Sequence, residues 1–158
     1  MREENTEANS IPRLAELSEF RYQLRAFLSF SEAASEACGI AAQQYQLMQV
    51  IAATPEGSSA SIRYLAERMI LRHNSAVELV DRAERAGMVR RRNDEQDLRR
   101  SLVELTPSGR EILQRLVAQH LEYLETRGEE LVRTLRTLQF VPQDGKRTSA
   151  ESEVGGGR

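Results

Sequence analysis

The chain has 158 residues, of which 40% are hydrophobic and 29% are charged, and its net charge is −2. This length suits one ordinary domain with a hydrophobic core rather than two domains, and no run approaches the roughly 18 consecutive apolar residues that a membrane-spanning helix needs. A single cysteine excludes an internal disulfide framework. Residues 1–10 show neither the basic start nor the apolar run of a secretory signal, so we expect a soluble, cytoplasmic protein.

Basic residues are concentrated in the middle of the chain. Residues 63–110 carry 11 basic groups, all of them arginine, against 8 acidic groups, whereas residues 1–62 carry 4 basic and 8 acidic groups. Arginine makes forked hydrogen bonds to phosphates and base edges. Because a local positive field matters more for docking than the total charge does, nucleic acid is the partner that this distribution favours.

Apolar spacing predicts a long first helix over residues 11–37. At about 100° per residue one face collects Leu14, Leu17, Phe20, Leu24, Phe27 and Leu28, and Tyr22 and Phe30 lie on a different side. In an isolated small domain, one apolar side of such a helix would be partly exposed to solvent. This pattern indicates that a partner subunit covers it. Gly39 ends this helix, and a second one is predicted over residues 41–53.

Two short helices and a hairpin follow. The helices are predicted at residues 62–69 and 73–86, and Gly87 stops the second one. After Gly87 the apolar period changes to two, which predicts strands at residues 88–92 and 101–105 joined by the charged stretch 93–100. A helix, a tight turn, a helix and a hairpin with a basic tip form the layout of a winged helix-turn-helix.

A further long helix is predicted from Thr106-Pro107, an N-cap followed by a first-turn proline. Gly128 is expected to interrupt it and to leave a final helical piece up to Leu138. We therefore expect a mainly α fold with a small β wing, a winged helix-turn-helix with long flanking dimerisation helices. The predicted domain spans residues 11–141, with the winged lobe at 58–105, dimerisation helices at 11–38 and 106–141, and disordered tails at 1–10 and 142–158.

The second helix of such a pair enters the major groove of DNA, where its N-terminal side chains reach base edges. The candidate DNA-binding residues of this helix are Arg72, His73, Asn74, Ser75, Val77, Glu78 and Arg82. Val77 can touch a thymine methyl group, and Glu78 can either accept a hydrogen bond from cytosine or repel phosphate. His73 is interpreted as a groove-facing hydrogen-bonding residue rather than as a pH switch. Arg90, Arg91 and Arg92 fit either a solvated strand face or phosphate contacts.

The chain resembles the MarR family of bacterial transcription regulators in four ordered motifs. These are Leu65-Ala66-Glu67-Arg68, Leu79-Val80-Asp81-Arg82, Gly87-Met88-Val89 and the stretch from Asp97 to Thr106, which fits the family's D-x-R followed by V-x-L-T and a glycine, here Gly109. By this resemblance Asp97 braces Arg99 within the wing, and Arg99 and Arg100 contact phosphates or enter the minor groove. Arg100 is expected to remain free. The chain departs from the family at Ile70, where a glycine is common, and at Glu78, where a polar or basic residue is frequent.

The family resemblance also implies a homodimer, joined through the first helix and the last two, on a pseudo-palindromic operator. Many members have an effector pocket between the dimerisation helices and the DNA-binding lobe. Phe27, Tyr45 and Met48 are the candidates to line such a pocket for an aromatic or phenolic effector, although core packing explains the same residues. Cys38 is interpreted as inert packing rather than as a redox sensor, and His120 as a partly buried interface residue.

These patterns together predict a DNA-binding transcriptional regulator, a ligand-responsive repressor that binds double-stranded DNA as a homodimer. We expect no catalytic residue, metal or cofactor, because the sequence shows no nucleophile elbow, no phosphate-cradling glycine loop and no metal-ligand spacing. The alternative is a winged-helix interaction module that has lost specific DNA binding. That alternative predicts a neutral wing, whereas Asp97, Arg99 and Arg100 are present.

Overall fold

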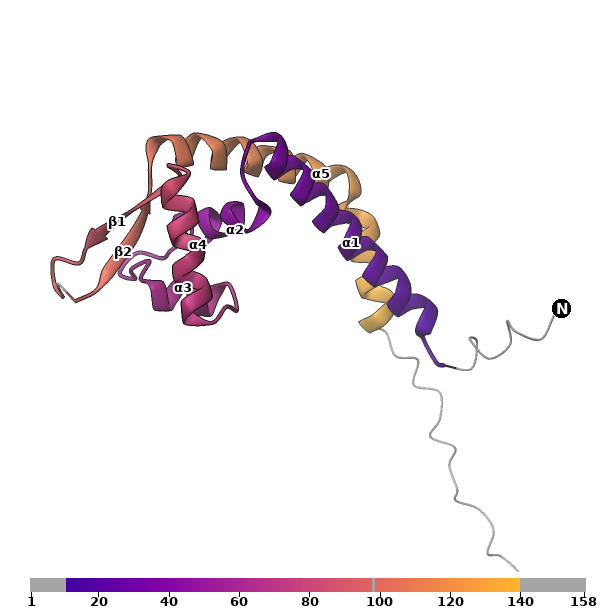
Figure 1. Cartoon of the computed structure of the whole chain (residues 1–158). Coiled ribbons are helices and arrows are strands. Elements are labelled where there is room, and N and C mark those ends of the chain that lie inside the picture. Colours follow the sequence, from indigo (N-terminus) through magenta and orange to yellow (C-terminus); the bar gives the residue numbers. More distant parts are fainter. Residues whose placement is uncertain (1–10, 98, 140–158) are drawn as a thin grey trace, which may run out of the picture.

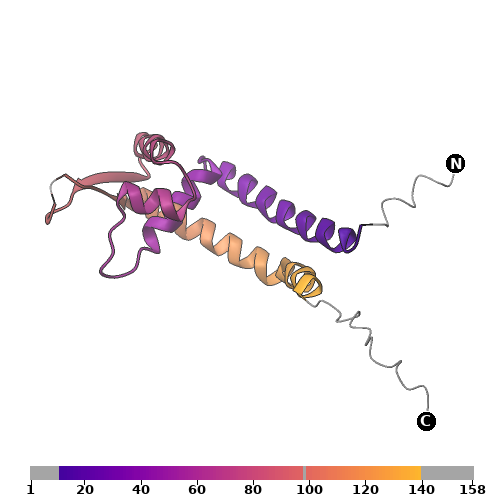
Figure 2. The same cartoon turned by 90° about the horizontal axis from the view of Figure 1, so that it is seen from below.

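The computed structural model of the protein describes residues 11–97 and 99–139, and the tails expected at residues 1–10 and 142–158 lie outside this part. Its elements are α1 (Leu14–Ala37), α2 (Ala42–Ala52), α3 (Ile62–Arg68), α4 (His73–Arg85), β1 (Val89–Asn93), β2 (Ser101–Leu105) and α5 (Pro107–Gln139). Figure 1 and Figure 2 show α1 and α5 running side by side as an arm, with the elements from α2 to β2 gathered as a lobe at one end. The predicted mainly α fold with a small β wing is confirmed.

The hydrophobic core lies in the lobe and under the first half of α5. Tyr45, Leu47, Met48, Leu65, Leu79, Val80, Val89 and Leu116 are among its fully buried side chains. On α4 the buried residues are only Ala76, Leu79, Val80 and Ala83. Because this stripe is narrow and half of it is alanine, α4 packs closely on the core and leaves the rest of its surface outside.

The wing is an antiparallel hairpin in which Val89 pairs with Leu105 and Asn93 with Ser101. Its second strand is held on both sides, since the backbone N–H of Val103 also donates to the carbonyl of Ala60 at 2.9 Å. The connector before α3 is therefore tied to the middle of β2. None of the helices in the part of the chain described here is long and apolar enough to cross a membrane.

The arm differs from its prediction in two ways. α5 is one continuous helix from Pro107 to Gln139, so the expected interruption at Gly128 is wrong. A glycine weakens a helix by only about 1 kcal/mol, and packing along α1 outweighs this cost. The separation of Phe30 from Phe27 is also wrong, because both rings lie against His120 and Tyr123 of α5.

The junction between the lobe and α5 is built on backbone carbonyls at the end of α4. The hydroxyl of Thr106 donates to the carbonyl of Gly87 at 2.6 Å and accepts from the N–H of Gly109 at 3.0 Å. The N–H of Thr106 donates to the carbonyl of Met88 at 3.0 Å. A Cβ atom at Gly109 would lie 2.0 Å from that Met88 carbonyl oxygen, so only glycine fits there.

Replacing Gly109 by alanine should therefore lower the free energy of unfolding by about 2–3 kcal/mol, because the clash is with backbone that is itself hydrogen-bonded. Gly128→Ala is the matched control in the same helix, since its added Cβ would meet Leu124 at an ordinary 3.8 Å. That control should raise the free energy of unfolding by about 0.5–1 kcal/mol through helix propensity. Urea unfolding of the two variants would contradict this interpretation if both moved stability in the same direction.

Ile70 occupies the turn between α3 and α4 with a φ of 55°, and 92% of its surface is exposed. A left-handed backbone costs an L-residue roughly 1–2 kcal/mol, and the cost falls hardest on a β-branched side chain. Because the Ile70 side chain is exposed, hydrophobic burial does not offset this cost. The turn thus carries local strain at the position where the sequence departs from the family pattern.

Ile70→Gly should raise the free energy of unfolding by about 0.5–1 kcal/mol, since relief of the left-handed strain exceeds the extra chain entropy that glycine loses on folding. Ile70→Val, which keeps the β-branch, should leave stability unchanged. Thermal unfolding of both variants measures the effect. A loss of stability in Ile70→Gly would mean that the isoleucine side chain makes a favourable contact.

Candidate nucleic-acid interface

The surface of α4 that faces away from the core carries most of the predicted DNA-binding residues. Arg72, His73, Asn74, Ser75, Glu78 and Arg82 are exposed, and Val77 is half-buried. Arg72 stands at the N-cap position and makes no side-chain hydrogen bond to the first turn. Since the first amides of a helix have no partner within the helix, they can bind an anion there.

A groove joins the N-terminal end of α4 to the wing. It has a volume of about 460 Å³ and is lined by Ser61, Ile62, Arg63, His73, Arg99, Arg100 and Ser101; we call it the wing groove. The structure thus brings three predicted residues, His73, Arg99 and Arg100, to one place. A polyanion that followed this groove would meet the start of α4 and the wing together.

Ser61 and Arg63 are polar residues of the wing groove that the sequence analysis did not assign to a site. Ser61 is the N-cap of α3 and its hydroxyl accepts from the N–H of Tyr64, and Arg63 lies in the first turn of the same helix. Arg63 pairs with Glu67 at 3.0 Å, with both side chains largely exposed. Such surface pairs contribute little, so Arg63 can exchange its partner. The one sequence signal that could have identified these two residues is Ser61, a residue type that favours the N-cap position, directly before the helix that begins at Ile62.

The tip of the wing is organised differently from the prediction. Asp97 accepts a hydrogen bond from the backbone N–H of Arg99 at 3.0 Å, so it shapes the turn through the backbone of Arg99. Arg100 donates to the hydroxyl of Ser59 at 3.2 Å and lies 3.8 Å from the carboxylate of Asp94. The expectation that Arg100 remains free is therefore wrong, because closure of the hairpin places Asp94 beside it.

The three consecutive arginines of β1 are held in ion pairs. Arg90 and Arg92 both contact Glu104 on β2, at 2.6 and 3.3 Å, which follows from the pairing of Arg90 opposite Glu104. Arg91 instead reaches back to α4 and contacts Asp81 and Glu84, each at 2.6 Å. Arg91 therefore fits neither of the two sequence interpretations, a solvated strand face or a phosphate contact. It bridges β1 and α4 instead.

The candidate effector residues lie in packed surroundings. Tyr45 and Met48 are fully buried in the core, and burial raises the pKa of Tyr45. The rings of Tyr45 and Phe27 both contact His120, with centroid distances of 4.6 and 5.9 Å. The structure therefore brings Phe27 and Tyr45 together around His120 and places Met48 in the core.

His120 and Cys38 also have defined places. The ring nitrogens of His120 lie 2.7 Å from the carbonyl of Leu116 and 2.9 Å from the hydroxyl of Ser31. His120 is thus buried inside its own chain, where we expected a partly buried interface residue. Cys38 is half-buried at the end of α1 and packs against the core.

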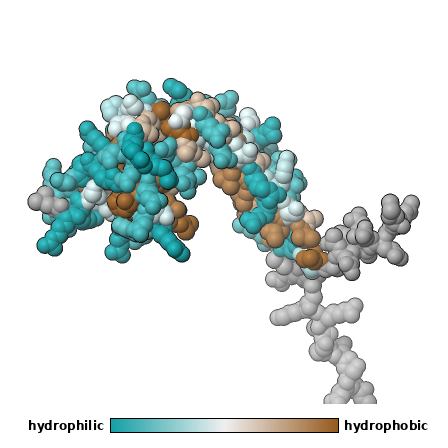
Figure 3. Space-filling view, viewed as in Figure 1, coloured by the Kyte–Doolittle hydropathy of each residue, from teal (hydrophilic) through white to brown (hydrophobic). Residues whose placement is uncertain are grey.

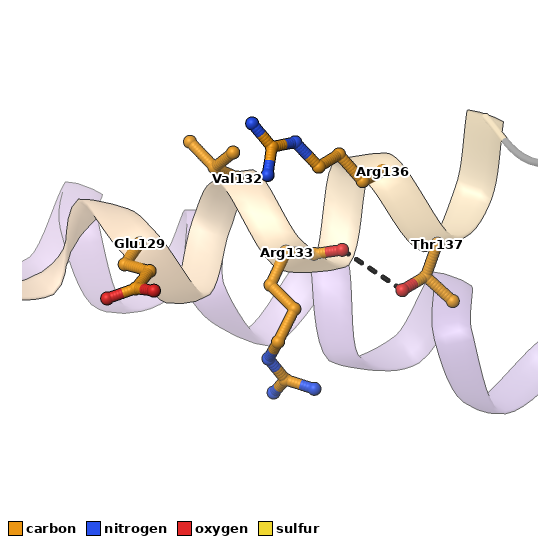
Figure 4. Close-up of a pocket in the computed structure, with 5 residues that line it drawn as sticks. All are labelled: Glu129, Val132, Arg133, Arg136 and Thr137. Carbon is orange, nitrogen blue, oxygen red and sulfur yellow. Dashed lines mark hydrogen bonds between the residues drawn. The ribbon is translucent and has the colours of Figure 1, made fainter.

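A second cavity lies at the far end of the arm, distant from the lobe. It measures about 320 Å³ and is lined by Glu129, Val132, Arg133, Arg136 and Thr137. Figure 4 shows these side chains spread over the surface of α5, with the Thr137 hydroxyl bonded to the carbonyl of Arg133. Among the residues that the structure describes, no group of three His, Cys, Asp or Glu side chains could hold a metal ion.

The arrangement of α3, α4 and the hairpin defines a winged helix-turn-helix. A family model described as the MarR family matches residues 39–100. This match confirms the resemblance that the sequence motifs predicted. A comparison with curated protein sequences finds no match.

Solved structures of MarR-family transcription regulators share the fold. A MarR family protein from Bacillus stearothermophilus is 24% identical, with a TM-score of 0.62 over 80% of this chain and 90% of that chain. AbsC, a MarR family transcriptional regulator from Streptomyces coelicolor, is 21% identical, with a TM-score of 0.62 over 75% of this chain and 83% of its own. A mutant MarR from E. coli complexed with operator DNA is 21% identical, with a TM-score of 0.61 over 83% of this chain and 94% of that one.

Proposed function

We propose that the protein is a DNA-binding transcriptional regulator that acts as a homodimer on a pseudo-palindromic site in double-stranded DNA. The observation that carries this proposal is the wing groove, which sets His73, Arg99 and Arg100 beside the uncapped start of α4. The relatives with this fold include MarR, solved with operator DNA. The proposed location is the cytoplasm.

In the proposed complex, α4 enters the major groove and the wing follows the adjacent backbone or minor groove. Asn74 and Ser75 present hydrogen-bonding groups to base edges, and Val77 offers a methyl contact to thymine. Glu78 is exposed on the same helix and would accept a hydrogen bond from a cytosine amino group. Arg72 and Arg82, together with Arg63 and Arg99 from the groove, contact phosphates.

Dimerisation is supported by the apolar surface of the arm. Large side chains along α1 and α5 are 39–57% exposed, namely Leu14, Leu17, Tyr22, Leu28, Leu121, Leu124, Val132 and Leu135. Figure 3 shows apolar residues gathered along the arm, while the lobe is mainly hydrophilic. Covering each residue contributes about 1 kcal/mol, and a second copy of the arm offers a surface of the same character. The two copies of α4 in such a dimer would then read half-sites about one helical turn of DNA apart.

The proposed regulator is a repressor that responds to a small aromatic or phenolic effector. Such a ligand acts by favouring a dimer whose recognition helices are wrongly spaced for successive major grooves. Since Phe27 and Tyr45 pack on His120, effector binding at these residues would require the junction between lobe and arm to open. The effector and the DNA would therefore compete through the geometry of this junction.

Fluorescence anisotropy with duplex DNA from upstream of the protein's own gene tests the proposal. Binding should be tight in 50 mM salt and should weaken by about 10³-fold or more in 200 mM salt, because phosphate contacts release counterions. A random duplex of equal length is the control, and the mass of the free protein in solution should be that of a dimer. Failure to bind any of these duplexes at either salt concentration would contradict the proposal and favour a protein-interaction module.

Arg99→Ala and Asn74→Ala should separate phosphate contacts from base contacts. Arg99→Ala should weaken binding to specific and random DNA alike and reduce the slope of log K against log salt by about 1 for each subunit. Asn74→Ala should cost about 1–3 kcal/mol on the specific duplex and little on the random one. Equal effects of Asn74→Ala on both duplexes would show that the N-terminal end of α4 does not read bases.

A further inference from the structure

Arg91 connects the wing to α4. Its guanidinium contacts the carboxylates of Asp81 and Glu84 on α4, each at 2.6 Å. Its backbone N–H also donates to the second oxygen of Glu84 at 3.0 Å. One residue of β1 is thus attached to α4 at three points, through both its side chain and its backbone.

The electrostatic surroundings show that these contacts are firm. The Arg91 side chain is only 27% exposed, less than those of Arg90, Arg92 and Arg100 in the other ion pairs of the wing. The hydrogen bond from the backbone N–H of Arg91, followed by the one from its guanidinium, lowers the pKa of Glu84. Burial lowers the pKa of Arg91, but hydrogen bonds to Asp81 and Glu84 outweigh this effect and raise it. The Glu84 carboxylate and the Arg91 guanidinium therefore remain charged together at neutral pH.

The place of Arg91 in the hairpin gives these contacts a mechanical consequence. Arg91 lies at the middle pair of the hairpin, opposite Val103, whereas Arg99 lies in the loop beyond the last pair and lines the wing groove. A change in the angle between β1 and α4 displaces the tip more than the base. The position of Arg99 relative to the start of α4 therefore depends on the contacts that Arg91 makes.

We propose that Arg91 is a positioning residue for DNA binding, which fixes the angle of the wing against α4 so that Arg99 meets the DNA backbone while α4 lies in the major groove. This inference rests on the proposed function. It assigns no DNA contact to Arg91. The contribution of Arg99 to affinity depends on Arg91, although Arg91 lies in the strand β1 and Arg99 lies in the loop of the wing.

Arg90 is the matched control. It is the neighbouring residue on the same strand and carries the same charge, but its partner Glu104 belongs to the hairpin itself. Loss of Arg90 leaves the attachment of the wing to α4 intact. Arg90→Ala and Arg91→Ala thus remove equal charge from the protein and differ in the contact between elements.

A double-mutant cycle with Arg99→Ala measures the proposed dependence. Dissociation constants for one specific duplex are determined by anisotropy for the wild type, Arg90→Ala and Arg91→Ala, each with and without Arg99→Ala, at a temperature where circular dichroism shows all six to be folded. Arg99→Ala should weaken binding about 10-fold in the wild type and in Arg90→Ala. In Arg91→Ala it should weaken binding less than 2-fold, since the tip is already displaced.

A second pair of substitutions covers the case in which Arg91→Ala does not fold. Asp81→Asn combined with Glu84→Gln keeps the shape of both partners and removes the ion pairs, and it makes the recognition helix more positive. If Arg91 only offset the charge of these carboxylates, this variant would bind DNA at least as well as the wild type and Arg99→Ala would retain its full effect. Positioning predicts instead that the effect of Arg99→Ala shrinks.

The possible outcomes separate the two proposals. An equal effect of Arg99→Ala in the wild type, Arg90→Ala and Arg91→Ala overturns the positioning role and leaves the DNA-binding function standing. Loss of the Arg99 effect in Arg90→Ala as well overturns it too, because charge would then be the cause. A wild type that binds no DNA overturns the proposed function and, with it, the role of Arg91.

Discussion

The carbonyl oxygen of Met88 lies where α4, the wing and the long helix α5 meet. It accepts the N–H of Thr106 and leaves no room for a side chain at Gly109. The same threonine hydroxyl binds the carbonyl of Gly87 and caps the first turn of α5. The end of α4, the base of the hairpin and the start of the arm therefore share one small set of backbone hydrogen bonds. The direction of the arm relative to α4 depends on this contact.

A second constraint acts further along the hairpin, where Arg91 joins β1 to the outer side of α4. The two constraints hold the wing from both of its strands, because Thr106 follows β2 and Arg91 belongs to β1. Two anchored strands leave the hairpin little freedom to rotate. This stiffness matters in the proposed regulator, because α4 must contact the major groove while the wing contacts the DNA backbone. A wing that is already held in place loses less conformational freedom when both contacts form.

The charge of residues 63–110 shows that composition does not reveal which arginines are available to a partner. Its surplus of arginine over acidic residues predicted a positive surface, yet Arg90, Arg91, Arg92 and Arg100 are all engaged with carboxylates of the same lobe. These arginines form ion pairs within the fold, so the surplus is not all available to a partner. Counting charges along a sequence cannot separate these roles, because ion pairs join Arg91 to Asp81 and Arg100 to Asp94 across turns of the chain.

The sequence by itself determined the order and type of the elements, and placed the boundaries of α3, α4 and β2 within one residue, because apolar periodicity and glycine stops are local signals. The motif from Asp97 to Thr106 also indicated the resemblance to the MarR family. Only the tertiary structure decided the rest: the continuity of α5 through Gly128, the shared face of Phe27 and Phe30, and the partners of Arg91 and Arg100. Each of these depends on which surfaces pack together, and a long-range contact leaves no periodic trace in the sequence.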